Sequence, residues 1–265
     1  MRRKLGRTLA LILTPALGVA GLLALVLHPQ APPARSASQW TGLPPPAASG
    51  FVVPAPHELA ALRGASRWAP VRSSVLARAA PGPRAHPVAA VSTQTPEGTT
   101  NILELLGPAR VGRTGLWQRV RLAVLPNGTS AWVPRSALGG SVVLDTHLLV
   151  DRAHLHMSLF RDGKRVFSAP IGIGQPQSPT PAGDFYVRNV LSRYRSATYG
   201  PIAFGTSARS PTLTDWPAGG YVGIHGTNQP NLIPGRISHG CIRLRNADIL
   251  RLAALMPVGT PITVQ

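Results

Sequence analysis

The sequence predicts a mainly β protein with one clear helix, in which two β-rich parts follow an apolar amino-terminal segment. Three observations support this class. Short runs rich in β-branched and aromatic residues alternate with Gly, Pro and Asn turns from residue 66 onward. Apolar residues recur with the 3.6-residue period of an α-helix in one segment near the carboxyl end. Residues 8–27 carry no charge and are almost entirely apolar.

Composition limits the classes of protein that this chain can belong to. The 265 residues include 27 basic and 9 acidic side chains, a net charge of +18, and 44% are hydrophobic, too many for a disordered chain. One cysteine excludes an internal disulfide, a four-cysteine zinc site and an iron–sulfur cluster. The charge indicates an anionic partner. No block of like charges forms a nucleic-acid-binding arm, so we expect no nucleic-acid partner.

Residues 1–27 are predicted to be a signal anchor or a signal peptide. Four cations lie upstream of the apolar run, which predicts that the chain after Leu27 lies outside the cytoplasm. A run of about 20 apolar residues is long enough to span a bilayer core, which favours an uncleaved anchor. Cleavage stays open, because Pro15 and Gly18 shorten the uninterrupted apolar segment. Residues 28–65 are rich in Pro and Ala and are predicted to be an extended linker.

Residues 66–140 are predicted to form a small barrel-like β domain. Several short β-leaning runs are separated by Pro-Gly, Gly-Pro and Asn127-Gly128 turns. We expect Trp117 and Trp132 to lie in its core. The stretch WQRVRLAVLPNGTSAWVPRSAL resembles the end of a bacterial SH3-like wall-binding domain.

Residues 141–265 are predicted to form a second, larger β domain. Alternating Leu155, Met157 and Leu159, followed by an Arg-Asp-Gly-Lys turn, predict a hairpin over 154–171. We expect residues 188–220, which contain several Gly and Pro residues, to form a loop.

A helix and a last strand are predicted to close the chain. Asn246 is expected to cap the helix, and Asp248 favours its first turn. Its apolar positions follow helical spacing, at Ile249, Leu252, Ala253 and Met256. Pro257 and Gly259 end it, and Pro261–Gln265 reads as the last strand.

Cys241, the only cysteine, lies in Ser238-His239-Gly240-Cys241, and a second histidine, His225, precedes it. Three roles for the thiol are open. It is a buried structural thiol, a zinc ligand together with both histidines, or a nucleophile activated by a histidine that accepts its proton. In the third role, Gly240 allows backbone N–H groups to approach the reacting carbonyl as oxyanion donors.

The motifs around Cys241 resemble those of the L,D-transpeptidase (YkuD) family over about residues 145–265. They comprise His225-Gly226, Ser-His-Gly-Cys-x-Arg-x-x-Asn from Ser238, the Ser178-Pro-Thr-Pro-Ala-Gly-Asp-Phe185 turn and the closing helix and strand. The resemblance implies a β-sandwich or mixed β catalytic domain over 141–265. It also implies an extracytoplasmic enzyme of peptidoglycan that needs no cofactor or metal.

The resemblance implies a reaction as well. Cys241 attacks the third-residue carbonyl of a tetrapeptide stem, D-alanine leaves, and an acceptor amine takes the acyl group to form a 3-3 cross-link. His225 is expected to donate and accept the proton, and His239 to orient the site or serve as the alternative base. The backbone N–H groups of Gly240 and Cys241 are expected to bind the oxyanion, and the loop over residues 188–220 is expected to cover the donor stem.

Further residues are expected to bind substrate, and other functions stay open. The expected binding residues are Arg243, Ser238, Gly226, Thr227, Tyr194 and Arg195. The expected partners are donor and acceptor stem peptides, cell-wall polyanions, and the membrane through residues 8–27 if they are uncleaved. An L,D-carboxypeptidase of the same fold and a catalytically dead wall-binding protein are the alternatives.

Overall fold

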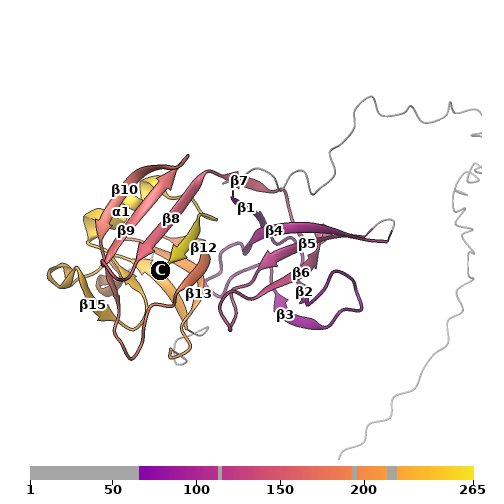
Figure 1. The fold of residues 1–265 in the computed structure, drawn as a ribbon, viewed down its shortest axis with the longest axis horizontal. Coiled ribbons are helices and arrows are strands. Elements are labelled where there is room, and N and C mark those ends of the chain that lie inside the picture. Colours follow the sequence, from indigo (N-terminus) through magenta and orange to yellow (C-terminus); the bar gives the residue numbers. More distant parts are fainter. Residues whose placement is uncertain (1–65, 113–114, 193–195, 214–219) are drawn as a thin grey trace, which may run out of the picture. The chain divides into compact units, whose positions relative to one another are not determined.

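The computed structural model describes residues 66–112, 115–192, 196–213 and 220–265. The predicted membrane segment (1–27) and linker (28–65) lie outside the described residues. Within the described ranges, no helix has the length and apolar character needed to cross a membrane. The described chain is mainly β with one α-helix, as predicted, and is arranged in two sheets (Figure 1).

The first sheet has seven strands in the order β3-β2-β6-β5-β4-β1-β7, each antiparallel to its neighbours. Its strands are β1 (Ser66–Pro70), β2 (Val75–Arg78), β3 (Pro87–Val91), β4 (Ile102–Val111), β5 (Gly115–Arg121), β6 (Ser130–Pro134) and β7 (Val142–Leu144). A core of alternating apolar residues, among them Val120 and Val133, packs on one face. Trp117 is buried, as expected, whereas Trp132 is only half-buried, so placing its whole side chain in the core was wrong.

The second sheet has ten strands in the order β10-β9-β8-β17-β12-β13-β14-β16-β11-β15. Its strands are β8 (Thr146–Asp151), β9 (His156–Arg161), β10 (Lys164–Pro170), β11 (Gly172–Gly174), β12 (Gly183–Leu191), β13 (Ala203–Arg209), β14 (Tyr221–His225), β15 (Gly235–Ser238), β16 (Ile242–Arg243) and β17 (Pro261–Val264). Among the described residues, three short 3₁₀ helices lie between strands, at Arg135–Ala137, Ala197–Tyr199 and Pro230–Leu232. Both sheets belong to one compact unit of the chain.

The predicted hairpin is confirmed as β9 and β10. Asp162 and Gly163 at its tip both have positive φ, at 50° and 72°, the combination that a two-residue hairpin turn requires. Met157 and Leu159 alternate into the core and are fully buried. The predicted last strand is also confirmed, as β17.

The predicted helix is confirmed as α1 (Asn246–Leu255), with Ile249 and Leu252 buried on its inner face. Its cap differs from the prediction. Arg245 occupies the N-cap position, and Asn246 is already the first helical residue. The Asn246 side chain accepts the Thr227 N–H at 2.9 Å instead, which joins the helix to the end of β14. Capping by Asn246 was therefore wrong, because its oxygen serves a distant loop.

The predicted loop over residues 188–220 was also wrong for much of its length. Strand β12 continues to Leu191, which pairs with Ala203 at the start of β13. Buried Asn189 and half-buried Val190 lie in this pairing, so tertiary contacts extend the sheet through a segment rich in polar residues.

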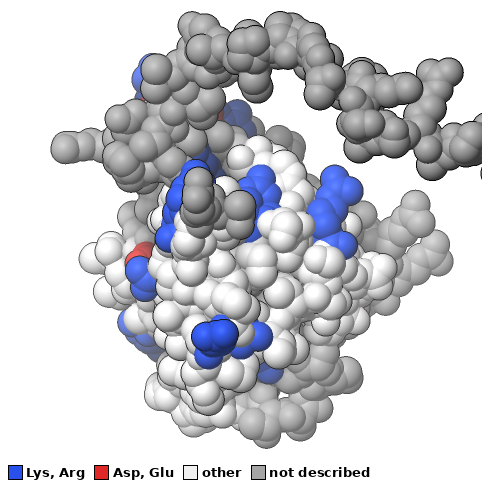
Figure 2. Space-filling model, turned by 90° about the vertical axis from the view of Figure 1, so that its right-hand side faces the viewer, with Lys and Arg blue, Asp and Glu red and all other residues white. Residues whose placement is uncertain are grey.

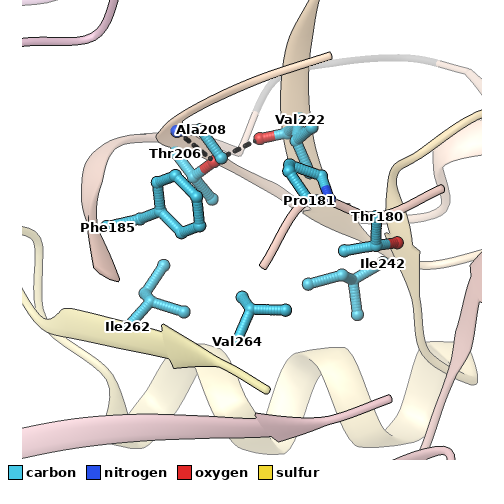
Figure 3. Close-up of a pocket in the computed structure, with 9 residues that line it drawn as sticks. All are labelled: Thr180, Pro181, Phe185, Thr206, Ala208, Val222, Ile242, Ile262 and Val264. Carbon is cyan, nitrogen blue, oxygen red and sulfur yellow. Dashed lines mark hydrogen bonds between the residues drawn. The ribbon is translucent and has the colours of Figure 1, made fainter. Parts of the chain in front are cut away.

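The core of the second sheet is closely packed beneath the strands that carry the site. A small void of about 10 Å³ lies between side chains of β12, β13, β14, β16 and β17 and of Thr180 and Pro181, and Figure 3 shows the residues that line it. Thr206 lies beside it and donates its hydroxyl to the Val222 carbonyl at 2.6 Å (Figure 3). A space of this size lined by apolar groups is a packing defect rather than a binding site.

Candidate active site

The site forms where two parallel strands run side by side. β14 pairs with β16, and the register aligns Ile224 with Ile242 and His225 with Arg243. Cys241, directly before β16, therefore lies opposite Gly223. The Gly223 N–H donates to Cys241 Sγ at 3.4 Å. The topology thus brings the predicted cysteine and histidine to adjacent strands.

Gly223 separates the two reactive side chains. A Cβ at this position would lie 3.9 Å from His225 Cδ2 and 4.0 Å from Cys241 Sγ. Both side chains therefore flank the glycine, and the missing side chain leaves the space above it open. Sequence reasoning missed Gly223, because a glycine within a strand also marks a bulge or a bend.

His225 is held as a neutral imidazole. Its Nδ1 lies 2.6 Å from the Gly226 carbonyl oxygen. A carbonyl only accepts, so Nδ1 carries the proton and Nε2 keeps its lone pair. Burial lowers the pKa of His225 to about 4; the bond to Gly226 opposes this shift, and the Arg243 charge adds to it. The Tyr199 ring lies 4.6 Å from the imidazole, centroid to centroid.

Cys241 is half-buried. Burial raises the pKa of its thiol, and the Gly223 hydrogen bond and the Arg243 charge offset this only in part. Near neutral pH the thiol therefore holds its proton. A base has to take that proton before or during any attack by sulfur.

The turn before Cys241 is closed by its own hydrogen bonds. The Ser238 hydroxyl donates to the Cys241 carbonyl and accepts the Gly240 N–H at 3.1 Å. Thr180, from the proline-rich turn, donates its hydroxyl to the Gly240 carbonyl at 2.8 Å. Gly240 has φ +119°, which only glycine adopts readily. The Gly240 N–H is thus bonded within the turn, and its role as an oxyanion donor stays a prediction.

Two of the predicted substrate-binding residues, Gly226 and Thr227, are buried directly after β14. Thr227 is 1% exposed, and its hydroxyl accepts the Gln229 N–H at 3.1 Å. Gly226 is buried against Asn246, and its carbonyl orients the imidazole. Neither residue lines the cavity beside Cys241, and direct binding of substrate by Thr227 and Gly226 stays a prediction.

A cavity of about 430 Å³ opens above the two strands, a volume typical of ligand sites, which span about 300–1,000 Å³. The predicted residues that line it are His225, Ser238, His239, Cys241 and Arg243. His239 is exposed, whereas Ser238 is fully buried and its hydroxyl is occupied in the turn. Tyr194 and Arg195 lie outside the described residues.

The positive charge of Arg243 acts on both His225 and Cys241. Its guanidinium Nε is buried and has no hydrogen-bond partner within the described residues. A buried donor without a partner is unfavourable, and an anionic ligand would relieve it. Glu97, which lies in the first sheet's part of the chain, also lines the cavity, and sequence reasoning missed it. Among the described residues, no three His, Cys, Asp or Glu side chains gather as metal ligands.

Comparison with known proteins agrees with this geometry. The model of the L,D-transpeptidase catalytic domain (YkuD) matches residues 145–264. The putative L,D-transpeptidase YkuD of Bacillus subtilis is 30% identical over 142 residues, covering 54% of this chain and 78% of that protein. The probable L,D-transpeptidase YbiS of Escherichia coli is 30% identical over 187 residues, covering 62% and 60%. These matches define the class as an enzyme of acyl transfer.

More particularly, the chain belongs to the L,D-transpeptidase family typified by YkuD. Among solved structures, a mutant of the Enterococcus faecium L,D-transpeptidase is 29% identical, covers 46% of this chain and 50% of that chain, and has a TM-score of 0.37. The chain thus spans most of the Bacillus relative but about half to three fifths of these other two proteins.

Proposed function

We propose that this chain is a peptidoglycan L,D-transpeptidase in which Cys241 is the nucleophile and His225 the general base and acid. The observation that carries the proposal is the β14–β16 pair, which sets a neutral imidazole and a protonated thiol on either side of Gly223. A neutral base beside a neutral thiol favours proton transfer during attack over a preformed thiolate.

In the first half of the reaction, Cys241 Sγ attacks the carbonyl carbon of the third stem residue as His225 Nε2 takes the thiol proton. The tetrahedral intermediate then expels D-alanine, whose nitrogen receives that proton from His225. The C–N bond breaks and a thioester remains. We propose the Cys241 N–H as an oxyanion donor, because the Gly240 N–H is occupied by Ser238.

In the second half, a side-chain amine of another stem attacks the thioester. His225 accepts a proton from the amine and returns it to the leaving sulfur, which regenerates the thiol and forms the 3-3 cross-link. Arg243 is proposed to bind a stem carboxylate through its guanidinium, whose Nε has no hydrogen-bond partner within the described residues. His239, exposed at the pocket edge, is proposed to orient the substrate.

The rest of the chain is proposed to deliver this site to the wall. Residues 1–27 direct the chain out of the cytoplasm as an anchor or signal peptide, residues 28–65 form a linker, and residues 66–140 form an SH3-like wall-binding domain. Figure 2 shows Lys and Arg side chains at several separate places on one face of the molecule. In the first sheet's part of the chain, exposed cations include Arg72, Arg84, Arg110 and Arg119. Cell-wall polyanions are the proposed partners of this charge.

The test is to incubate the full chain with disaccharide-tetrapeptides and to analyse the products by mass spectrometry. We expect released D-alanine and a cross-linked dimer, and neither from Cys241→Ala. A folded wild-type chain that yields neither product contradicts the proposal. D-alanine release that leaves only tripeptide would instead identify an L,D-carboxypeptidase, in which water replaces the amine.

A further inference from the structure

Tyr221, at the start of β14, lies between two guanidinium groups. The Arg188 carbon Cζ is 3.8 Å from the centre of the tyrosine ring, and that of Arg209 is 4.3 Å away. Both distances are within the reach of cation–π attraction, about 6 Å. Because β14 continues to Gly223 and His225, whatever fixes Tyr221 also fixes the strand that carries the base.

Each arginine is held by a different loop of the first sheet. Arg188 Nη2 donates to both carboxylate oxygens of Glu97, at 2.9 Å each, and Glu97 lies between β3 and β4. The Arg209 backbone N–H donates to Asn127 Oδ1 at 2.9 Å, and its carbonyl accepts Asn127 Nδ2 at 2.7 Å. Asn127 lies in the turn between β5 and β6. Two separate loops of the first sheet's part of the chain therefore hold the two arginines that contact the Tyr221 ring.

The Glu97–Arg188 contact is built to persist. Arg188 is 2% exposed, so removal of its partner would leave an uncompensated buried charge. Asn189 Nδ2 also donates to Glu97 Oε2, at 3.1 Å. Burial alone would raise the pKa of Glu97, but the Arg188 charge and hydrogen bonds from Thr95 and Asn189 lower it overall. The carboxylate is therefore ionised at neutral pH.

We propose that the first sheet positions the active site, with Glu97 and Asn127 as positioning residues that act through Arg188, Arg209 and Tyr221 on β14. Glu97 also lines the pocket, so the pocket is incomplete without this part of the chain. The inference rests on the proposed function only where D-alanine release is used to measure activity. It assigns the first sheet a part in catalysis that is separate from any wall binding.

The test compares Glu97→Gln and Asn127→Ala with a matched control, Glu104→Gln, in the full chain. Glu104 is the other carboxylate of the first sheet and pairs with Arg121 at 2.6 Å, within the same sheet. Two readouts are used: kcat and KM for D-alanine release, and the pH dependence of Cys241 alkylation by iodoacetamide. The second readout needs no transpeptidase activity.

We expect Glu97→Gln and Asn127→Ala each to lower kcat about tenfold with little change in KM, and each to change the pH profile of alkylation, because β14 carries both Gly223 and His225. Glu104→Gln should leave both readouts at the wild-type value. In a Tyr221→Leu background, Glu97→Gln should have no further effect, because the ring that transmits it is gone.

Three outcomes would overturn the inference. A rise in KM alone would make Glu97 a direct substrate contact. An equal loss in Glu104→Gln would reduce the effect to general destabilisation of the first sheet. An undiminished effect in the Tyr221→Leu background would exclude the proposed route. If Glu97→Gln does not fold, Asn127→Ala tests the same route alone. If the chain releases no D-alanine but alkylation shifts as expected, the proposed function fails while the positioning role stands.

Discussion

The two sheets differ in which polar groups they bury. The first sheet's part of the chain has three buried polar residues among those described, namely Thr95, Glu104 and Gln118. The second buries many more, including Arg188, His225 and Ser238. Buried polar groups need partners and are unfavourable without them. His225 and Ser238 line the pocket, and Arg188 holds Glu97, which also lines it, so part of this buried polarity lies at the candidate site.

The largest expected effect concerns two histidines that line the same pocket, one buried and one exposed. Buried His225 has a fixed tautomer, whereas His239 is exposed. His225→Gln should lower kcat/KM about 10³-fold, in the range that positioned acid–base groups contribute. His239→Gln should lower it less than about tenfold. D-alanine release measures both.

Cys241 alkylation as a function of pH provides the control for this comparison. In His225→Gln the thiol has lost its base and can lose its proton only to hydroxide in solution. The rise of the alkylation rate should therefore occur at higher pH in His225→Gln than in His239→Gln. An equal or larger loss of turnover in His239→Gln would move the role of base to the exposed histidine. It would also break the link between burial and chemistry in this pocket.

The comparison also explains what the sequence could predict. The hairpin, the helix and the last strand follow from apolar periodicity and turn chemistry, both of which are local. Cys241 and His225 could be proposed from the sequence because their motifs are local as well, and the structure brings the two residues to adjacent strands. Glu97 and Asn246 were missed or given the wrong role, because their side chains serve partners 91 and 19 residues away. Such partnerships depend on the register of strands, which no local pattern encodes.

The next largest expected effect is on the free energy of unfolding, and it tests whether the two sheets unfold in a single transition. Leu148, fully buried in the second core, and Leu103, 3% exposed in the first, are matched in size. Each Leu→Ala change should destabilise the fold by about 3 kcal/mol through lost burial and a cavity. Because Tyr186 donates its hydroxyl to the Ile102 carbonyl at 3.1 Å across the two sheets, we expect one shared transition.

Urea unfolding followed by far-ultraviolet circular dichroism and by tryptophan fluorescence measures this effect. Coincident midpoints in both variants would support a single cooperative unit. A Leu103→Ala variant with two separate transitions would show that the first sheet unfolds alone, and the sheets would then be independent in stability.

A smaller effect follows from the pKa of His225. Folding lowers this pKa from 6.5 to about 4 through burial, so below pH 6.5 the unfolded chain binds more protons than the folded chain. Stability from this group is therefore complete above pH 6.5 and is lost as the pH falls toward 4. We expect a loss on the order of 2 kcal/mol between these limits. In His225→Gln this part of the pH dependence should vanish, and an unchanged dependence would contradict a buried neutral imidazole.

The smallest effect is expected where the second sheet's part of the chain carries charge at its surface. Arg251 pairs with Asp248 on α1 at 3.4 Å, and its side chain is 64% exposed. Solvent and salt screen such pairs, so Arg251→Ala should change the free energy of unfolding by less than about 0.5 kcal/mol. Urea denaturation at low and high salt measures it. A loss well above 1 kcal/mol that persisted in high salt would instead point to packing of the guanidinium over Phe167, 5.4 Å away. An exposed charge on α1 would then also contribute to the stability of this part of the chain. Burial alone would no longer identify which charged side chains stabilise it.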